Sequence, residues 1–200
     1  MDTLYTIGHS NHPQDHFIEL LGAHNISALA DVRSSPFSKY MPQYNKGVIE
    51  TVLTEADITY VYLGKELGAR RSEESCYVDG KVSFERAAQM PLFQKGLERL
   101  FQGISQYRVA LMCSEADPIT CHRTILVCRE VKKARPDIQI VHILGDGDEE
   151  TQEEAEQRLV ALHRLQPELF GDMTTLSGLV NQAYALQAEK IAYQKGAEEE

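Results

Sequence analysis

The segment CSEADPITCHR, residues 113–123, gathers several reactive side chains within eleven positions. Its two cysteines offer thiols, its glutamate a carboxylate and its histidine an imidazole, so each could serve as a nucleophile or a proton carrier. An apolar run precedes the segment and a helical pattern follows it. We therefore predict a ligand site here, with catalysis by thiols and proton carriers. The catalytic candidates are Cys113, Glu115, Cys121, His122 and His9.

The same segment also favours an anionic ligand. A helix that begins near Cys121 would present backbone N–H groups without partners in the helix, and Arg123 adds a fixed positive charge. This environment also lowers the pKa of a cysteine. We expect a small anion, nucleotide-like or derived from nucleic acid. The candidates for binding it are Gly8, Ser10, Asp31, Arg33, Gly64, Arg71 and Arg123.

Several other interpretations of the segment stay open. Cys113 lies ten residues before Arg123, which argues against a Cys-x5-Arg phosphatase loop. Seven residues separate the two cysteines, which fits no common zinc knuckle, so we predict neither a metal ligand set nor a cofactor. The thiols could serve a hydrolase, a transferase or a redox sensor. A noncatalytic module that binds a small anion or nucleotide is a further alternative, and a purely structural role for buried thiols and a capped helix is another.

The elements that must position these residues alternate between strand and helix. Five apolar, β-branched runs are expected to be strands, and helical periodicity lies between them. The pattern predicts an α/β fold, a Rossmann-like three-layer sandwich with a mostly parallel sheet of about five strands. The runs cover residues 3–7, 26–32, 58–63, 107–113 and 138–144.

Polar residues cluster after the carboxyl ends of the first four predicted strands. Because parallel strands all end at the same edge of a sheet, these connections should meet around one site. The connections are Gly8–Asn11, Asp31–Pro36, Leu63–Arg71 and residues 113–123. By contrast, His142 lies within a predicted strand and is expected to be a hydrogen-bonded core residue.

The third connection opens a long insertion. Within it, Asp79 and Gly80 separate two short β-prone runs, which predicts a two-residue hairpin turn. If the insertion folds over the strand ends, it would form a lid carrying Arg70, Arg71 and one or two aromatic rings.

Charge divides the chain unevenly. Residues 1–145 hold 16 Lys and Arg against 17 Asp and Glu, and residues 146–200 hold 4 against 13. We expect an α/β domain over 1–145 and an acidic helical C-terminal extension over 146–200, packed on it, with the last few residues disordered. Its second helix, near 174–193, bears an apolar stripe that packs on its own domain or serves a homodimer contact. The acidity argues against strong nonspecific binding of nucleic acid.

The chain shows no segment typical of secretion or of membrane insertion. The first residues lack the basic and apolar regions of a signal peptide, and no apolar run approaches the roughly 20 residues of a membrane helix. We therefore expect a cytoplasmic protein with no membrane partner. Its four cysteines are expected to be reduced there.

These motifs together resemble the family known as domain of unknown function 488. The resemblance rests on Gly8-His9-Ser10, Asp31-Val32-Arg33 with Ser35-Pro36, Leu63–Gly68 with Arg71, Cys113-x-Glu115 followed by Cys121-His122-Arg123, and the tail residues Ala183-Tyr184 and Ile191-Ala192-Tyr193. It implies an intracellular α/β domain whose motifs gather at one site, and it implies no reaction. Ala69 stands where glycine is common in the family, so the loop is expected to be stiffer here.

Overall fold

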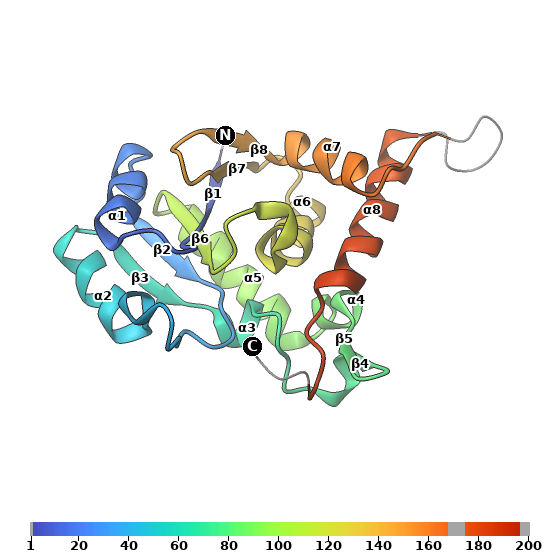
Figure 1. The fold of residues 1–200 in the computed structure, drawn as a ribbon, viewed down its shortest axis with the longest axis horizontal. Coiled ribbons are helices and arrows are strands. Elements are labelled where there is room, and N and C mark those ends of the chain that lie inside the picture. Colours follow the sequence, from blue (N-terminus) through green and yellow to red (C-terminus); the bar gives the residue numbers. More distant parts are fainter. Residues whose placement is uncertain (1, 168–174, 197–200) are drawn as a thin grey trace.

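A six-stranded sheet forms the centre of the chain. The structure is a computed structural model that describes residues 2–167 and 175–196. The strand order is β3-β2-β6-β1-β7-β8, and all pairs are parallel except β7 with β8 (Figure 1). The strands are β1 (Thr3–Gly8), β2 (Ala28–Asp31), β3 (Thr59–Tyr62), β6 (Val109–Cys113), β7 (Gln139–Ile143) and β8 (Glu149–Thr151).

All five predicted strands are present, which confirms the Rossmann-like α/β interpretation. The sixth, β8, was not expected. It lies after residue 145, in the segment that we assigned to the acidic extension, so the sheet continues into that segment. Its sequence, Glu-Glu-Thr, has no apolar alternation because it is a short edge strand, and charged residues are common on such edges.

Two helices cover one face of the sheet. They are α1 (Gln14–Ala23) and α2 (Lys46–Glu55), and their buried apolar residues share one core cluster with Tyr5 and Ile7 of β1 and with Met112 of β6. In α1 the buried residues are Phe17, Leu20 and Leu21. In α2 the buried residues are Ile49 and Leu53.

The other face carries a thicker layer of helices. It comprises α3 (Gly64–Leu67), α4 (Phe84–Ala88), α5 (Pro91–Ile104), the π-helix η4 (Arg123–Cys128), α6 (Arg129–Ala134), α7 (Gln152–Leu162) and α8 (Leu176–Ile191) (Figure 1). In α8, Leu179 and Ala183 are buried against this layer, whereas Leu176 and Leu186 are exposed. The predicted apolar stripe therefore packs on its own chain over part of its length.

The insertion after β3 contains the predicted hairpin. It consists of β4 (Tyr77–Val78) and β5 (Lys81–Val82), joined by Asp79 and Gly80, which both have positive φ. The segment after α8 pairs with this hairpin: the Val82 N–H donates to the Tyr193 carbonyl oxygen at 2.9 Å, and the Lys195 N–H donates to that of Gly80. Of the residues predicted to be disordered at the C-terminus, 197–200 lie outside the described residues.

The connections after β1 and β6 leave the sheet toward opposite faces. The chain after β1 enters α1 on one face, and the chain after β6 enters η4 and α6 on the other, although the two strands are neighbours. Such a reversal opens a crevice at the carboxyl edge, where open α/β sheets bind ligands. Within the described residues, no helix has both the length and the apolar character needed to cross a bilayer.

Candidate functional site

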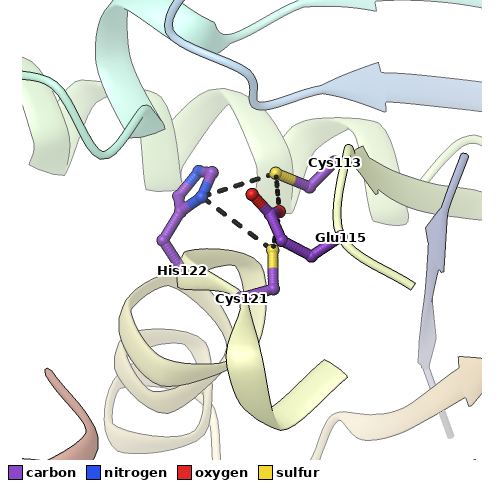
Figure 2. A group of neighbouring side chains, drawn as sticks. All are labelled: Cys113, Glu115, Cys121 and His122. Atoms are coloured by element: carbon purple, nitrogen blue, oxygen red, sulfur yellow. Dashed lines mark hydrogen bonds between the residues drawn. The ribbon is translucent and has the colours of Figure 1, made fainter. Parts of the chain in front are cut away.

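Four reactive side chains converge at the carboxyl end of β6. Cys113 ends the strand, Glu115 lies in the loop after it, and Cys121 and His122 come just before η4. Both sulfurs lie beside the same carboxylate oxygen, Glu115 Oε2, at 3.0 Å for Cys113 and 2.9 Å for Cys121 (Figure 2). His122 Nδ1 is 3.4 Å from the Cys113 sulfur and 4.0 Å from that of Cys121. The four side chains thus form one compact group, called the sulfur cluster below.

The orientation of the His122 ring is fixed by the neighbouring strand. Its Nε2 lies 3.0 Å from the carbonyl oxygen of Val32, which can only accept a hydrogen bond. Nε2 therefore carries a proton, and in the neutral ring Nδ1 presents its lone pair to the two sulfurs. Because Val32 follows β2, this contact ties the loop after β6 to the end of another strand.

The surroundings shift the pKa values of the two thiols in opposite directions. Burial, the Cys121 sulfur and the Glu115 carboxylate together hold the pKa of Cys113 well above its usual value. Burial also opposes the Cys121 thiolate, but hydrogen bonding from Cys113 and the charge of Arg123 outweigh it, so the pKa of Cys121 is well below the usual value. For His122, the Cys121 sulfur outweighs burial and raises the pKa. Cys121 is thus the sulfur that carries negative charge most readily.

Arg123 holds the backbone beside the sulfur cluster in place. The fully buried guanidinium donates from Nη1 to the Glu115 carbonyl oxygen at 2.6 Å, and from Nη2 to that of Ala116 at 3.0 Å. Its Nε donates to Thr6 Oγ1, and its backbone N–H lies 3.4 Å from the Cys121 sulfur. We predicted an anion clamp at this residue, but the structure commits the guanidinium to the protein's own carbonyl groups.

Gly8 makes the loop's position possible. A Cβ atom at Gly8 would lie 1.9 Å from the Glu115 carbonyl oxygen, so only glycine lets the loop after β6 cross the end of β1. Gly64 has the same relation to the Arg33 carbonyl oxygen, also at 1.9 Å. Both glycines serve close packing of the strand ends.

A second buried polar group lies after β1 and β2. Arg33 donates from Nε and Nη2 to both carboxylate oxygens of Asp31, at 2.9 and 2.6 Å, and from Nη2 also to the Tyr44 carbonyl oxygen. Its Nη1 donates to His9 Nε2 at 3.1 Å. The His9 ring stacks on Tyr44, and burial together with the charge of Arg33 lowers the pKa of His9 to about 4. His9 is therefore a neutral acceptor held by Arg33, and these contacts place it outside the sulfur cluster.

A pocket of about 230 Å³ opens between the two polar groups. The sulfur cluster contributes Cys113, Glu115 and His122 to one part of its wall. The rest of the lining comes from the connections after β2, β3 and β6 and from the end of the chain: Arg33, Ser34, Ser35, Ala69, Arg70, Ser114, Ile191 and Tyr193. The Arg70 guanidinium lies 4.9 Å from the centre of the Tyr193 ring.

Two other predicted residues have local partners. Arg71 donates to the Glu66 carbonyl oxygen at 2.7 Å and forms an ion pair with Glu73, and its Nε has no hydrogen-bond partner among the residues that the structure describes. Ser10 has a positive φ and donates to the Asn11 side chain. Neither residue lines the pocket.

Sequence reasoning missed part of the pocket wall and one property of the cluster. Ser34 and Ser35 were visible within the second connection, and Tyr193 within the tail motif, but nothing in their spacing indicates that they meet. The four donor atoms of the sulfur cluster all lie within 4.8 Å of one another, a geometry that could hold a metal ion. The sequence did not indicate this arrangement, because the spacing of the cysteines was compared only with zinc knuckles, whose ligands lie close together in the sequence.

Comparison with known proteins identifies the family. The sequence model of the family described as "Domain of unknown function DUF488" matches residues 13–129, more than half of the chain. The chain belongs to the DUF488 family. The matched segment contains three of the DUF488 motifs recognised above, around Asp31, Gly64 and Cys113, while Gly8–Ser10 and the tail lie outside it. A comparison with curated proteins gives no match.

Proposed function

We propose that this DUF488 protein is an enzyme that binds a small anionic, nucleotide-like ligand in the pocket and acts on it with the sulfur cluster. The observation that carries the proposal is the composition of the pocket wall. Cys113, Glu115 and His122 lie on the same cavity as Arg33 and Arg70. Thiol, carboxylate and imidazole supply reactive groups, while the Arg70 guanidinium and the serine hydroxyls favour a negative charge.

The size of the pocket limits what enters it. Its volume of about 230 Å³ lies below the roughly 300–1,000 Å³ typical of sites that enclose a whole ligand. A phosphate or carboxylate end fits inside, and a larger remainder would extend outward. Tyr193 at the rim, paired with Arg70, offers an aromatic face on which a base could stack. This combination supports a nucleotide or a nucleic-acid fragment as the ligand.

The cluster supports nucleophilic chemistry by Cys113 as a hydrolase or transferase. Cys113 lines the pocket, and His122 Nδ1 lies 3.4 Å from its sulfur, positioned to take the thiol proton as the sulfur attacks. The new bond joins Sγ to the electrophilic atom of the ligand, and the bond to the leaving group breaks as that group takes the proton from His122. Water or another acceptor then releases the ligand from the sulfur, which regenerates the thiol.

The binding part of this proposal is tested by titrating the whole chain with inorganic phosphate and with nucleoside monophosphates. Both calorimetry and thermal unfolding should report binding. A ligand at 100 times its Kd should raise the free energy of unfolding by about 2.7 kcal/mol. Arg70→Ala should weaken this binding at least tenfold, because it removes a cation from the pocket wall. The control is Arg86→Ala, which changes an exposed arginine outside the pocket.

The chemical part is tested with any ligand that binds. Cys113→Ser should keep binding and abolish turnover, since a serine hydroxyl is a far weaker nucleophile at neutral pH. If Cys113→Ser turned the ligand over at the wild-type rate, thiol catalysis would be wrong. If no anion bound, or if Arg70→Ala bound as tightly as the wild type, the assignment of the pocket would be wrong.

A further inference from the structure

The donor atoms of the sulfur cluster lie close enough together to surround one metal ion. In a tetrahedral zinc centre, with bonds of about 2.3 Å to sulfur and 2.0–2.2 Å to nitrogen or oxygen, neighbouring donors lie roughly 3.3–3.8 Å apart. The four sulfur-to-oxygen and sulfur-to-nitrogen distances here run from 2.9 to 4.0 Å. All four donor atoms lie within 4.8 Å of one another, so small side-chain adjustments would bring them to the distances that a metal ion requires.

The histidine has the environment of a metal ligand. Imidazoles that bind metals usually donate their second N–H to a carbonyl or carboxylate, which fixes the ring and its tautomer. His122 donates from Nε2 to the Val32 carbonyl oxygen. Figure 2 shows its Nδ1 facing the two sulfurs. The ring therefore needs no change of tautomer and no flip before its Nδ1 can bind a metal ion.

The backbone that carries the other donors is also held in place. Arg123 binds the carbonyl groups of Glu115 and Ala116, and its own N–H points at the Cys121 sulfur, where it can stabilise a thiolate ligand. Asp117 accepts a hydrogen bond from the Ile119 N–H and forms an ion pair with Arg158. The loop between the two cysteines is thus braced at several points, which keeps the donors preorganised.

We propose that Cys113, Cys121, His122 and Glu115 bind one thiophilic divalent metal ion, with Zn²⁺ the best match. Two sulfur donors exclude the hard cations Mg²⁺ and Ca²⁺, which take oxygen ligands, and a Cys₂His set with a carboxylate suits zinc. Glu115 is the exchangeable ligand, because it lies on the pocket wall and its residue is exposed. Its release would leave three protein ligands and one open position facing the pocket, the pattern of catalytic zinc sites.

This inference goes beyond the proposed function: it keeps the anion pocket but assigns the two thiols to a metal ion instead of to nucleophilic attack. A bound zinc ion would take both sulfurs as ligands, so Cys113 would no longer be the nucleophile. Chemistry on the anionic ligand would then pass to a water molecule at the open position. Metal binding and anion binding are measured separately, so either can fail without the other.

The test begins with the full chain purified with a thiol reductant and without added chelator. Elemental analysis should find about one zinc per chain. After removal of the metal, titration with Co²⁺ should produce the visible bands of tetrahedral cobalt together with sulfur-to-cobalt charge transfer, and Zn²⁺ should displace it. Cys113→Ala, Cys121→Ala and His122→Gln should each weaken binding by more than about 100-fold, beyond what changes outside the ligand set cost. Glu115→Gln should keep the charge-transfer band and weaken binding less.

Cys76→Ala is the matched control, because Cys76 is also buried and free but lies in the insertion. It should bind Co²⁺ as the wild type does. Circular dichroism of each variant separates loss of binding from loss of the fold, and the wild-type titration needs no variant at all. A wild-type chain that binds no Co²⁺ or Zn²⁺ while both thiols are reduced would overturn the inference. So would a Cys113→Ala variant with unchanged affinity, or a chain whose two thiols form a disulfide in preference to binding metal.

Discussion

Gly8 and Glu115 touch through their backbones at the crossing of β1 and the loop after β6. The Cβ atom of an alanine at position 8 would lie 1.9 Å from the Glu115 carbonyl oxygen, which is far inside contact distance. Because the obstacle is backbone braced by Arg123, it cannot rotate away. Gly8→Ala should therefore lower the free energy of unfolding by about 2–4 kcal/mol and shift the loop. Chemical denaturation measures the first effect, and Co²⁺ titration of the folded fraction measures the second.

Gly22→Ala is the control for that substitution. Gly22 lies in α1, and a Cβ atom there would meet nothing within 4 Å. This change should leave stability unchanged or raise it by about 0.5–1 kcal/mol, because alanine favours a helix over glycine. Equal stabilities for Gly8→Ala and the wild type would mean that the loop is not held where the structure has it.

We predict that Arg123 contributes to the stability of the fold as well as to the geometry of the candidate site. Arg123→Met keeps much of the side-chain volume but removes a buried cation and leaves the Glu115 and Ala116 carbonyl groups without their donor. Hydrogen bonds from charged groups contribute about 1.5–3 kcal/mol each, so we expect a loss of roughly 3 kcal/mol or more. Urea unfolding provides the measurement. Arg135→Met, at an exposed ion pair with Asp137, should leave the stability close to that of the wild type.

Asp31 and Arg33 form a buried ion pair, and removing one partner is expected to destabilise the fold strongly. Asp31→Asn would leave the Arg33 charge buried without its carboxylate, and breaking such a pair typically costs about 3–5 kcal/mol. The double variant Asp31→Asn with Arg33→Met should recover part of that loss, because the uncompensated charge is gone. A double-mutant cycle measured by thermal unfolding checks this. Strictly additive losses would contradict the coupling.

Because His142 is buried, we predict that the fold loses stability in acid. Its Nδ1 accepts from Thr6 Oγ1 and its Nε2 donates to Gln152, while burial, first, and the charges of Arg123 and Arg158 lower its pKa to about 3. The unfolded chain takes up this proton near pH 6.5 and the folded chain does not, so stability falls as the pH drops from about 6.5 toward 3. At pH 5 the loss should be on the order of 2 kcal/mol.

His142→Gln should flatten this dependence, although the variant will be less stable at neutral pH. Urea unfolding between pH 5 and pH 7.5 gives the slope for each protein. An unchanged slope in His142→Gln would show that other groups cause the acid sensitivity.

The strands and the location of the site could be predicted because both depend on local patterns. The apolar runs identified β1, β2, β3, β6 and β7, and parallel topology places the polar residues after them at one edge. His142 was correctly predicted to be a hydrogen-bonded core residue, because a lone polar residue inside an apolar strand must find partners. The hairpin at Asp79 and Gly80 was equally visible, since few residue pairs tolerate two positive φ angles.

The roles of the arginines were harder to foresee. A guanidinium near a predicted anion site can bind a ligand or brace the backbone, and sequence does not separate the two. Arg123 braces carbonyl groups, Arg33 is occupied by Asp31, and Arg71 binds Glu66 and Glu73. The strand β8 and the pairing of the tail with the hairpin were also missed, because both depend on contacts between segments that lack apolar alternation.

The tail that closes beside the hairpin has a consequence for biosynthesis. Tyr193 lines the same pocket as Arg33 and Cys113, so that pocket is complete only when residue 193 has joined residues synthesised well before it. Chains grow from the N-terminus, and the sheet strands up to β7 emerge first. A nascent chain can therefore form most of its sheet on the ribosome while its pocket still lacks the aromatic side, and the pocket closes only after residue 193 has left the ribosome.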